Sequence, residues 1–345
     1  MKVFGQLLLM FVLSFITSCK KNDVKIDVTP SESTFDQSES PVYESQSSLA
    51  ADPSILREGE KLYMYYSTEE NSPEERIFGV VISEDNGKTW NAPDGNNQRD
   101  YPALYSQPNG WDNTLETVDV LKVGDEFWMY YSGYREGEED NAHVANYEIG
   151  LAISTNGIDF NRHPQSVAQP IIARNITNEN TDDRHALTSP GVVYEEGKFY
   201  MIYAGWNVTD DWKGPNAGIR IMAATSDDGV NWEKISTPLI QPSEVTYNPD
   251  INEATLLKTS DYWYVPFSTG SSIGLARSST FIGTYEIYSE PIATSNLLPW
   301  ATEVTAPDGL IEDGKMKLWY HGVSEPVFWP WVIGYSETDY PLEWK

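Results

Sequence analysis

A 15-residue unit that recurs five times limits the fold more than any other feature of this sequence. Each copy is expected to form a strand, a tight polar turn and a second strand, because β-branched and aromatic residues flank the turn. Four of the turns contain a glycine, which adopts the left-handed backbone of tight hairpins at little cost. The copies begin at Asp52, Thr117, Ser189, Glu253 and Ala306.

A third apolar strand follows each copy, and no helical period is found between the copies. Repeats of three or four strands that lie about 53 to 72 residues apart are typical of propeller blades. The sequence therefore predicts an all-β fold, a five-bladed β-propeller over residues 48–345. A β-sandwich with a second domain is the alternative, but it would not produce five copies in the same register.

The N-terminus resembles a bacterial lipoprotein signal. A basic start is followed by an apolar run over 7–16 that is too short to span a bilayer as a helix, and then by Cys19, the single cysteine of the chain. The resemblance implies a signal peptide over 1–18 and lipidation of Cys19; an ordinary secretory signal or a buried strand is the alternative. Residues 19–47 have the composition of a disordered tether. We expect a lipid-anchored protein of the Gram-negative cell envelope, periplasmic or on the cell surface.

Charge and aromatic content restrict the partners. The formal charge of −29 repels nucleic acid, and one cysteine cannot form a disulfide framework. The 12 Trp and 21 Tyr favour stacking on sugar rings. We expect a carbohydrate partner, a membrane contact only through the lipid anchor, no nucleic acid, and a monomer.

The first positions of the five copies should surround one pocket, because the inner strands of a propeller converge on its channel. Asp52 and Glu253 hold two of these positions and come from different blades. Glycoside hydrolysis needs such a pair, one carboxylate ionised and the other protonated. Alternatively, both residues cap strand starts or bind a channel cation.

With these residues the sequence resembles the propeller glycosidases of glycoside hydrolase family 43 and relatives, the arabinanase, levansucrase and invertase superfamily. The resemblance implies that Asp52 is the base and Glu253 the acid. The family has a third Asp in blade three, where this chain has Ser189. Glu116, or Asp182 and Asp183, could supply the missing charge, and we count Glu116 with the catalytic residues.

The resemblance implies no required cofactor, although a structural Ca²⁺ or Na⁺ ion could occupy the channel with His321 nearby; a hydrogen-bonded core histidine is the alternative for His321. Tryptophans expected between strands, Trp206, Trp212 and Trp329 among them, could stack on sugars or pack between blades. The residues expected to bind substrate are Ser189, His185, Asp308, Trp212 and Trp329.

Three functions remain open at this stage. The first is an exo- or endo-acting glycosidase, inverting by expectation, on an oligosaccharide or polysaccharide. The second is a catalytically inactive, surface-tethered propeller that binds glycans, which the Ser189 departure favours. The third is a retaining enzyme of the fructan-cleaving type, in which Asp52 attacks the sugar.

Overall fold

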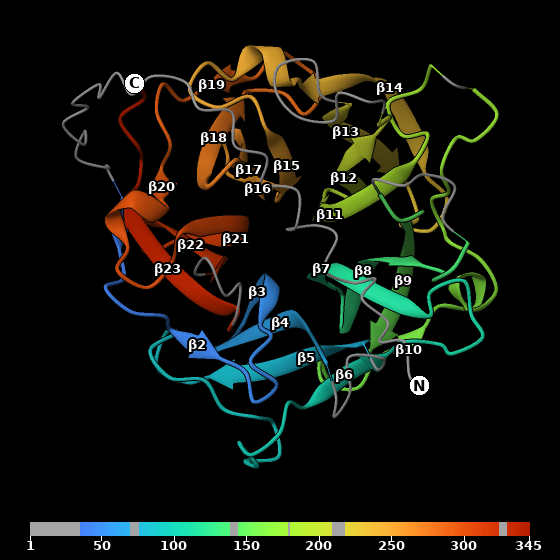
Figure 1. Ribbon diagram of the computed structural model, residues 1–345, viewed down its shortest axis with the longest axis horizontal. Helices are drawn as coiled ribbons and strands as arrows, with labels where there is room; N and C mark the ends of the chain where they lie inside the picture. Colours follow the sequence, from blue (N-terminus) through green and yellow to red (C-terminus); the bar gives the residue numbers. More distant parts are fainter. Residues whose placement is uncertain (1–34, 70–75, 139–143, 179, 209–217, 324–329) are drawn as a thin grey trace, which may run out of the picture.

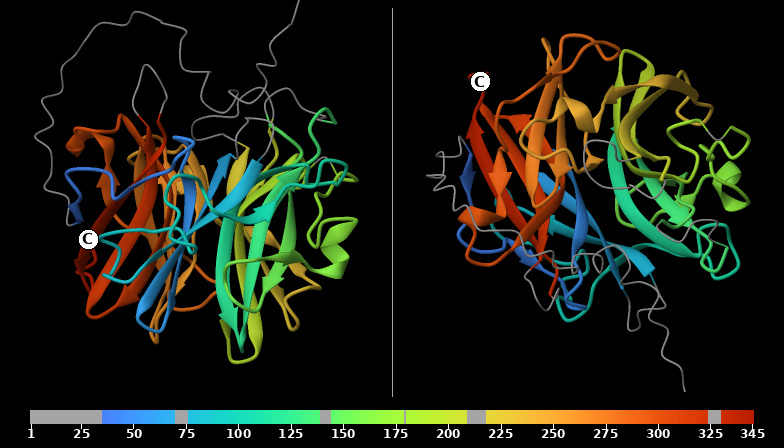
Figure 2. Two further views of the ribbon diagram at one scale, coloured as in Figure 1. Left: turned by 90° about the horizontal axis from the view of Figure 1, so that it is seen from below. Right: turned by 45° about the horizontal axis from the view of Figure 1, so that its top comes forward.

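The computed structural model describes residues 35–69, 76–138, 144–178, 180–208, 218–323 and 330–345. These residues form five antiparallel sheets arranged as blades around a central channel (Figure 1). In side view the blades stand next to one another around that channel (Figure 2). This confirms the predicted all-β fold and the five-bladed propeller.

Each blade is a meander whose first strand lies nearest the channel. The first blade comprises β3 (Ala51–Glu58), β4 (Lys61–Glu69), β5 (Arg76–Ser83) and β6 (Pro102–Tyr105). The second comprises β7 (Thr114–Val123), β8 (Glu126–Tyr134), β9 (Glu148–Ser154) and β10 (Asn161–Arg162). The third comprises β11 (Ala186–Glu195), β12 (Lys198–Trp206), β13 (Ile219–Ser226) and β14 (Glu233–Ile240).

In the fourth blade the first strand is split in two. This blade comprises β15 (Ile251–Ala254), β16 (Leu257–Lys258), β17 (Trp263–Thr269), β18 (Ser272–Ser278), β19 (Glu286–Ile287) and β20 (Ala293–Thr294). The fifth comprises β21 (Glu303–Glu312), β22 (Lys315–Val323) and β23 (Val332–Asp339), with β1 (Asp36–Gln37) and β2 (Tyr43–Glu44) added at its edge. Short 3₁₀ helices cover Pro164–Val167, Pro242–Glu244 and Ser295–Leu297. Among the described residues, no helix has the length and apolar character needed to cross a bilayer.

The N-terminal segment closes the ring, which corrects part of the predicted tether. Residues 35–47 are not a free linker, because β1 and β2 both pair with β23 at the far end of the chain. Phe35 is buried, and the Asp100 carboxylate accepts the main-chain N–H groups of Gln46 and Ser47 at 3.2 and 2.9 Å. The signal peptide expected over 1–18, Cys19 and the tether residues up to 34 lie outside the described residues.

The hydrophobic core lies between the blades. Tyrosine hydroxyls link neighbouring blades: Tyr65 donates to the Gly157 carbonyl at 2.7 Å, and Tyr130 donates to the Gly229 carbonyl at 2.8 Å. Both acceptors belong to turns that follow the third strand of the next blade. Trp206 is also part of the core, because it ends β12 with 1% of its surface exposed. The expectation that Trp206 lies in a loop is therefore wrong.

Candidate active site

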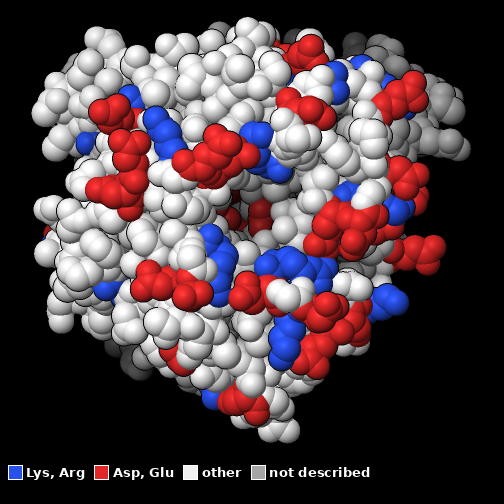
Figure 3. All heavy atoms as spheres, turned by 180° about the vertical axis from the view of Figure 1, so that it is seen from behind, with Lys and Arg blue, Asp and Glu red and all other residues white. Residues whose placement is uncertain are grey.

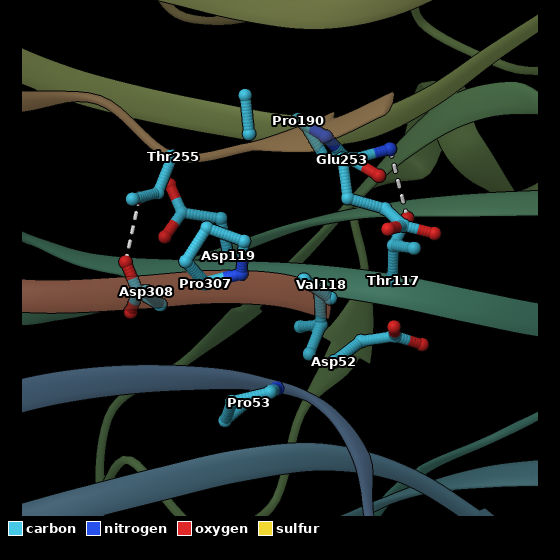
Figure 4. Close-up of a pocket in the computed structure, with 13 residues that line it drawn as sticks. Asp52, Pro53, Thr117, Val118, Asp119, Pro190, Glu253, Thr255, Pro307 and Asp308 are labelled. Carbon is cyan, nitrogen blue, oxygen red and sulfur yellow. Dashed lines mark hydrogen bonds between the residues drawn. The ribbon is translucent and has the colours of Figure 1, made fainter. Parts of the chain in front are cut away.

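The first residues of all five repeats line a single pocket at the channel, as predicted (Figure 4). The second repeat position lines the same pocket with apolar side chains, including Pro53, Val118 and Pro307. Asp52 and Glu253 lie on one side of these apolar side chains in the close-up view, and Asp119 and Asp308 lie on the other. The pocket thus holds two pairs of carboxylates from four different blades.

The backbone at the first repeat position is unusual in four of the five blades. Asp52, Thr117, Ser189 and Ala306 have φ values of 49°, 50°, 53° and 48°, in the left-handed region that non-glycine residues rarely adopt. Each lies at a register shift between the first and second strands of its blade. Such bulges change the direction of a strand and its side chains, and they are common beside active sites.

Asp52 is nearly buried, with 8% of its surface exposed. The His321 Nδ1 atom lies 3.4 Å from Asp52 Oδ1, and the same nitrogen accepts the Asp52 main-chain N–H at 3.1 Å. The His321 ring stacks on Trp331, with 4.9 Å between the ring centroids. His321 is therefore a direct neighbour of Asp52.

Glu253 has the environment of a carboxyl group that retains its proton. Burial raises its pKa most strongly, and the negative charge of Asp52 raises it further. Hydroxyls of Thr305 and Ser268 donate to one oxygen, Oε2, the latter at 2.9 Å. The other oxygen, Oε1, accepts only a long hydrogen bond of 3.3 Å from Asn252 among the described residues.

Glu116 belongs to the same electrostatic cluster. Burial, followed by the charge of Asp52, raises the pKa of Glu116 to about 7, and Glu253 contributes in the same direction. A hydrogen bond from Tyr147 and the charge of Arg76 act against this rise. Because charges couple in both directions, ionised Glu116 also favours the protonated form of Glu253.

The other suggested substitutes for the blade-three Asp are engaged elsewhere. Asp182 forms an ion pair with Arg220 at 3.2 Å, and Asp183 forms one with Lys234 at 2.5 Å. Neither residue lines the pocket. Glu116 does not line the pocket either, but of the three suggested carboxylates it is the one whose charge interacts with those of Asp52 and Glu253.

Ser189 and Asp308 line the pocket, as expected. The Ser189 hydroxyl is buried and has no hydrogen-bond partner among the described residues. His185 does not line the pocket. Its Nδ1 accepts the Val208 N–H at 3.0 Å, in the segment that follows β12. The predicted sugar-stacking residues Trp212 and Trp329 lie outside the described residues.

Asp119 was not predicted, although it holds the same third repeat position as Asp308. The Asp308 carboxylate accepts the Ile55 N–H and the Thr255 hydroxyl at 2.5 and 2.6 Å, and Asp119 accepts the Val192 N–H at 2.6 Å. Burial raises the pKa of Asp308 to about 6 and that of Asp119 well above its ordinary value. These contacts connect the inner strands of different blades, so Asp119 and Asp308 have a structural role.

The channel continues beyond this second pair into a cavity of about 280 Å³. Asp119, Thr255 and Asp308 line both the pocket and the cavity. From behind, the molecule is hollowed at its centre, and acidic side chains are visible inside the hollow (Figure 3). Among the described residues, no group of three or more His, Cys, Asp or Glu side chains has the geometry to hold a metal ion.

Comparisons with known proteins agree with this architecture. No family model matches the chain. A curated 1,2-beta-oligomannan phosphorylase from Thermoanaerobacter sp. (strain X514) is 30% identical over 98 residues, which are 28% of this chain and 28% of that protein. The match thus spans little more than a quarter of the curated relative.

Solved structures match over most of the chain. A thermostable family-43 glycoside hydrolase aligns with a TM-score of 0.61 and 18% identity, over 84% of this chain and 88% of that one. An alpha-L-arabinofuranosidase from Lactobacillus brevis aligns with a TM-score of 0.62 and 12% identity, over 85% and 91%. The chain is therefore a five-bladed β-propeller with the fold found in family-43 glycoside hydrolases and their relatives.

Proposed function

We propose that the protein is a glycoside hydrolase that cleaves an oligosaccharide or polysaccharide with Glu253 as general acid and Asp52 as general base. One observation carries this proposal: two carboxylates from different blades lie in one pocket, and the pKa of Glu253 is raised by burial and by the charge of Asp52. The names of the distant sequence relative and of the structural relatives support action on glycans.

In the proposed reaction, Glu253 donates its proton to the leaving glycosidic oxygen as the bond to the anomeric carbon breaks. Oε1 is the better proton carrier, because Oε2 already accepts two hydroxyl hydrogen bonds. Asp52 removes a proton from the water that attacks the opposite face of the sugar. Above about pH 7, where Glu116 is ionised, its negative charge favours the protonated form of Glu253, which is the role of the absent blade-three Asp.

Phosphorolysis is the second candidate, because the curated relative is a phosphorylase. In that reaction phosphate replaces water as the nucleophile. Four carboxylates line the described pocket, Asp52, Asp119, Glu253 and Asp308, and no Lys or Arg is found among its described lining residues. The described lining thus offers phosphate no cationic side chain, and each of its carboxyl groups that is ionised repels phosphate, which favours hydrolysis.

The proposed function is tested with a panel of oligosaccharides and aryl glycosides, with and without inorganic phosphate. We expect turnover that does not depend on phosphate and a loss of at least 100-fold in Asp52→Asn, in line with general-base catalysis. The matched control is Asp125→Asn, an exposed carboxylate in a hairpin turn, which should keep full activity. Phosphate-dependent turnover would support the phosphorylase, and binding without turnover would support the inactive glycan-binding propeller.

The stereochemical course needs a separate measurement. We propose inversion, with Asp52 acting on water, and NMR of the first product formed reports its anomeric configuration. A retained configuration would instead assign Asp52 the role of nucleophile, as in the fructan-cleaving alternative.

We also propose that Cys19 is lipidated and anchors the propeller to the cell envelope. The linker between Cys19 and the first described residue, Phe35, has the length to hold the propeller on the order of 20 Å from the bilayer. In a Gram-negative host we expect palmitate to label the protein, and Cys19→Ser to abolish both labelling and membrane retention. A Cys19→Ser protein that still fractionates with membranes would exclude the anchor.

A further inference from the structure

A repeated hydrogen bond joins the start of one inner strand to the second strand of the blade before it. In three blades the acceptor is a serine hydroxyl at the same place in the second strand, and the donor is the main-chain N–H of the next repeat's first residue. The pairs are Ser67 with Thr117 at 3.2 Å, Ser132 with Ser189 at 3.2 Å, and Ser268 with Ala306 at 2.8 Å. The Ser189 N–H also donates to the Thr117 hydroxyl at 2.9 Å. All three donor residues have positive φ.

Blade three is the exception, and it supports the link between this hydrogen bond and the strained backbone. Its second strand has Ala204 at the equivalent place, in register with Thr188 as Ser132 is with Glu116. An alanine side chain cannot accept a hydrogen bond. The first residue of the next repeat is Glu253, and it is not among the residues with positive φ. The first residue of a repeat therefore has left-handed backbone where the preceding blade supplies a side-chain acceptor, and it does not where that acceptor is absent.

In the fifth blade the equivalent residue is His321, in register with Thr305. Its Nδ1 accepts the N–H of Asp52, which has a φ of 49°. A hydroxyl can accept a hydrogen bond at any pH, whereas an imidazole nitrogen accepts only while it carries no proton. Among these hydrogen bonds, the one whose acceptor must stay unprotonated is the bond from the Asp52 N–H to His321, and Asp52 is the proposed base.

The same Nδ1 atom faces both parts of Asp52, the main-chain nitrogen at 3.1 Å and the carboxylate Oδ1 at 3.4 Å. A neutral ring with its proton on Nε2 accepts the N–H. A ring that is also protonated at Nδ1 must donate, and the carboxylate is then its partner. The two arrangements exclude each other, because they use the same nitrogen.

The groups around His321 favour its protonated form as the pH falls. Burial alone lowers the pKa of His321, but the hydrogen bond and charge of Asp52, followed by the charges of Glu253 and Glu303, raise it above its ordinary value. One face of the buried ring stacks on Trp331, which carries no charge.

We propose that His321 is a positioning residue that holds Asp52 in its active conformation only while the imidazole is neutral, so that protonation of His321 switches the site off. This inference rests on the proposed function, in which Asp52 is the base. The switch takes up one proton from solvent at Nδ1. Protonation breaks the hydrogen bond from the Asp52 N–H to His321 and forms a new hydrogen bond from His321 Nδ1–H to Asp52 Oδ1. The new bond occupies the carboxylate of the base, and the loss of the old one releases the strained backbone of Asp52.

The state of the ring can be measured without any substrate. The chain has four histidines, so long-range ¹H–¹⁵N spectra of histidine-labelled protein can resolve His321. Above neutral pH we expect the Nε2–H tautomer, and in Asp52→Asn we expect the His321 pKa to fall by about one pH unit or more. An Nδ1–H tautomer, or a titration that Asp52→Asn leaves unchanged, would overturn the proposal.

The effect on the reaction is tested with His321→Ser, which installs the acceptor that three other blades use. Serine does not titrate, so we expect the acidic limb of kcat/KM to leave the histidine range and to move to lower pH by about one pH unit or more. The matched control is His163→Asn, which does not change a pocket-lining residue. It keeps a side-chain acceptor for the Gln165 N–H and should leave the profile unchanged.

These measurements separate the inference from the function on which it rests. An acidic limb that stays in place in an active His321→Ser enzyme would contradict the switch while leaving the glycosidase intact. Loss of all activity in His321→Ser, with a normal melting temperature, would likewise contradict it, because serine should hold Asp52. A protein without turnover would refute the glycosidase, and the spectra would still decide whether His321 holds Asp52 as described.

Discussion

At the scale of single residues, four of the eight non-glycine residues with positive φ in the described part of the chain line the proposed active site. Asp52, Thr117, Ser189 and Ala306 adopt left-handed backbone although none of them is glycine. Such a conformation costs on the order of 1–3 kcal/mol and persists only where the surroundings enforce it. Side-chain acceptors on the preceding blade provide that restraint, so the ring of blades itself shapes the pocket.

The hydroxyl donors on Glu253 lead to a prediction about pH. Both hydroxyls stabilise the ionised carboxylate and so lower the Glu253 pKa, against the larger effect of burial. Thr305→Val removes one donor while keeping the shape of the side chain. A hydrogen bond to a charged group contributes about 1.5–3 kcal/mol, so we expect the basic limb of kcat/KM to move up by about one pH unit.

The conservative variant Thr305→Ser keeps the hydroxyl and should keep the parent profile. If Thr305→Val moved the basic limb to lower pH, or if Thr305→Ser shifted it equally, Glu253 would not be the group that titrates there.

At the scale of elements, the hairpin turns show where the sequence can be improved. The turn between β11 and β12 has positive φ at both Glu196 and Gly197, and the turn between β21 and β22 has it at Asp313 and Gly314. Asn and Asp tolerate this conformation much better than Glu. The backbone conformation of the turn between β11 and β12, which places Glu196 at positive φ, is therefore the less favourable of the two.

Glu196→Asn should therefore raise the free energy of unfolding by about 0.5–1 kcal/mol, measured by urea denaturation. Glu196 is exposed, so no packing is lost. The matched substitution Asp313→Asn should change little, because aspartate already suits its turn. A destabilised Glu196→Asn protein would contradict this account of the turn.

The repeat made the blades predictable because each is a local meander whose strands follow one another in sequence. β1 and β2 escaped prediction, since each has two residues and pairs with β23 about 300 positions away. Asp52 and Glu253 could be placed in one pocket from their repeat positions alone. The contact between His321 and Asp52 could not, because it depends on how blade five meets blade one after the ring has closed.

At the scale of the whole molecule, buried carboxyl groups and a formal charge of −29 make stability depend on pH. The pKa of Asp308 rises to about 6 in the folded protein, against about 3.9 in an unfolded chain. Between these two values the folded state binds the proton and the unfolded state does not. The free energy of unfolding should therefore fall as pH rises from about 4 to about 6.

We expect a melting temperature several degrees higher at pH 5 than at pH 7.5. Loss of self-repulsion among the surface carboxylates on acidification acts in the same direction. Asp308→Asn, which cannot ionise, should reduce the difference between the two pH values. A melting temperature that rises steadily with pH, in the parent and the variant alike, would show that Asp308 is ionised at pH 5.

The acid role of Glu253 is tested most directly by the dependence of rate on the leaving group. An acid is needed when the departing oxygen is a poor leaving group, and it is nearly dispensable for an activated aryl glycoside. With Glu253→Gln we therefore predict a loss of at least 100-fold on an oligosaccharide and less than tenfold on a dinitrophenyl glycoside of the same sugar. Equal losses on both substrates, in a variant that folds normally, would contradict the assignment of Glu253 as the acid.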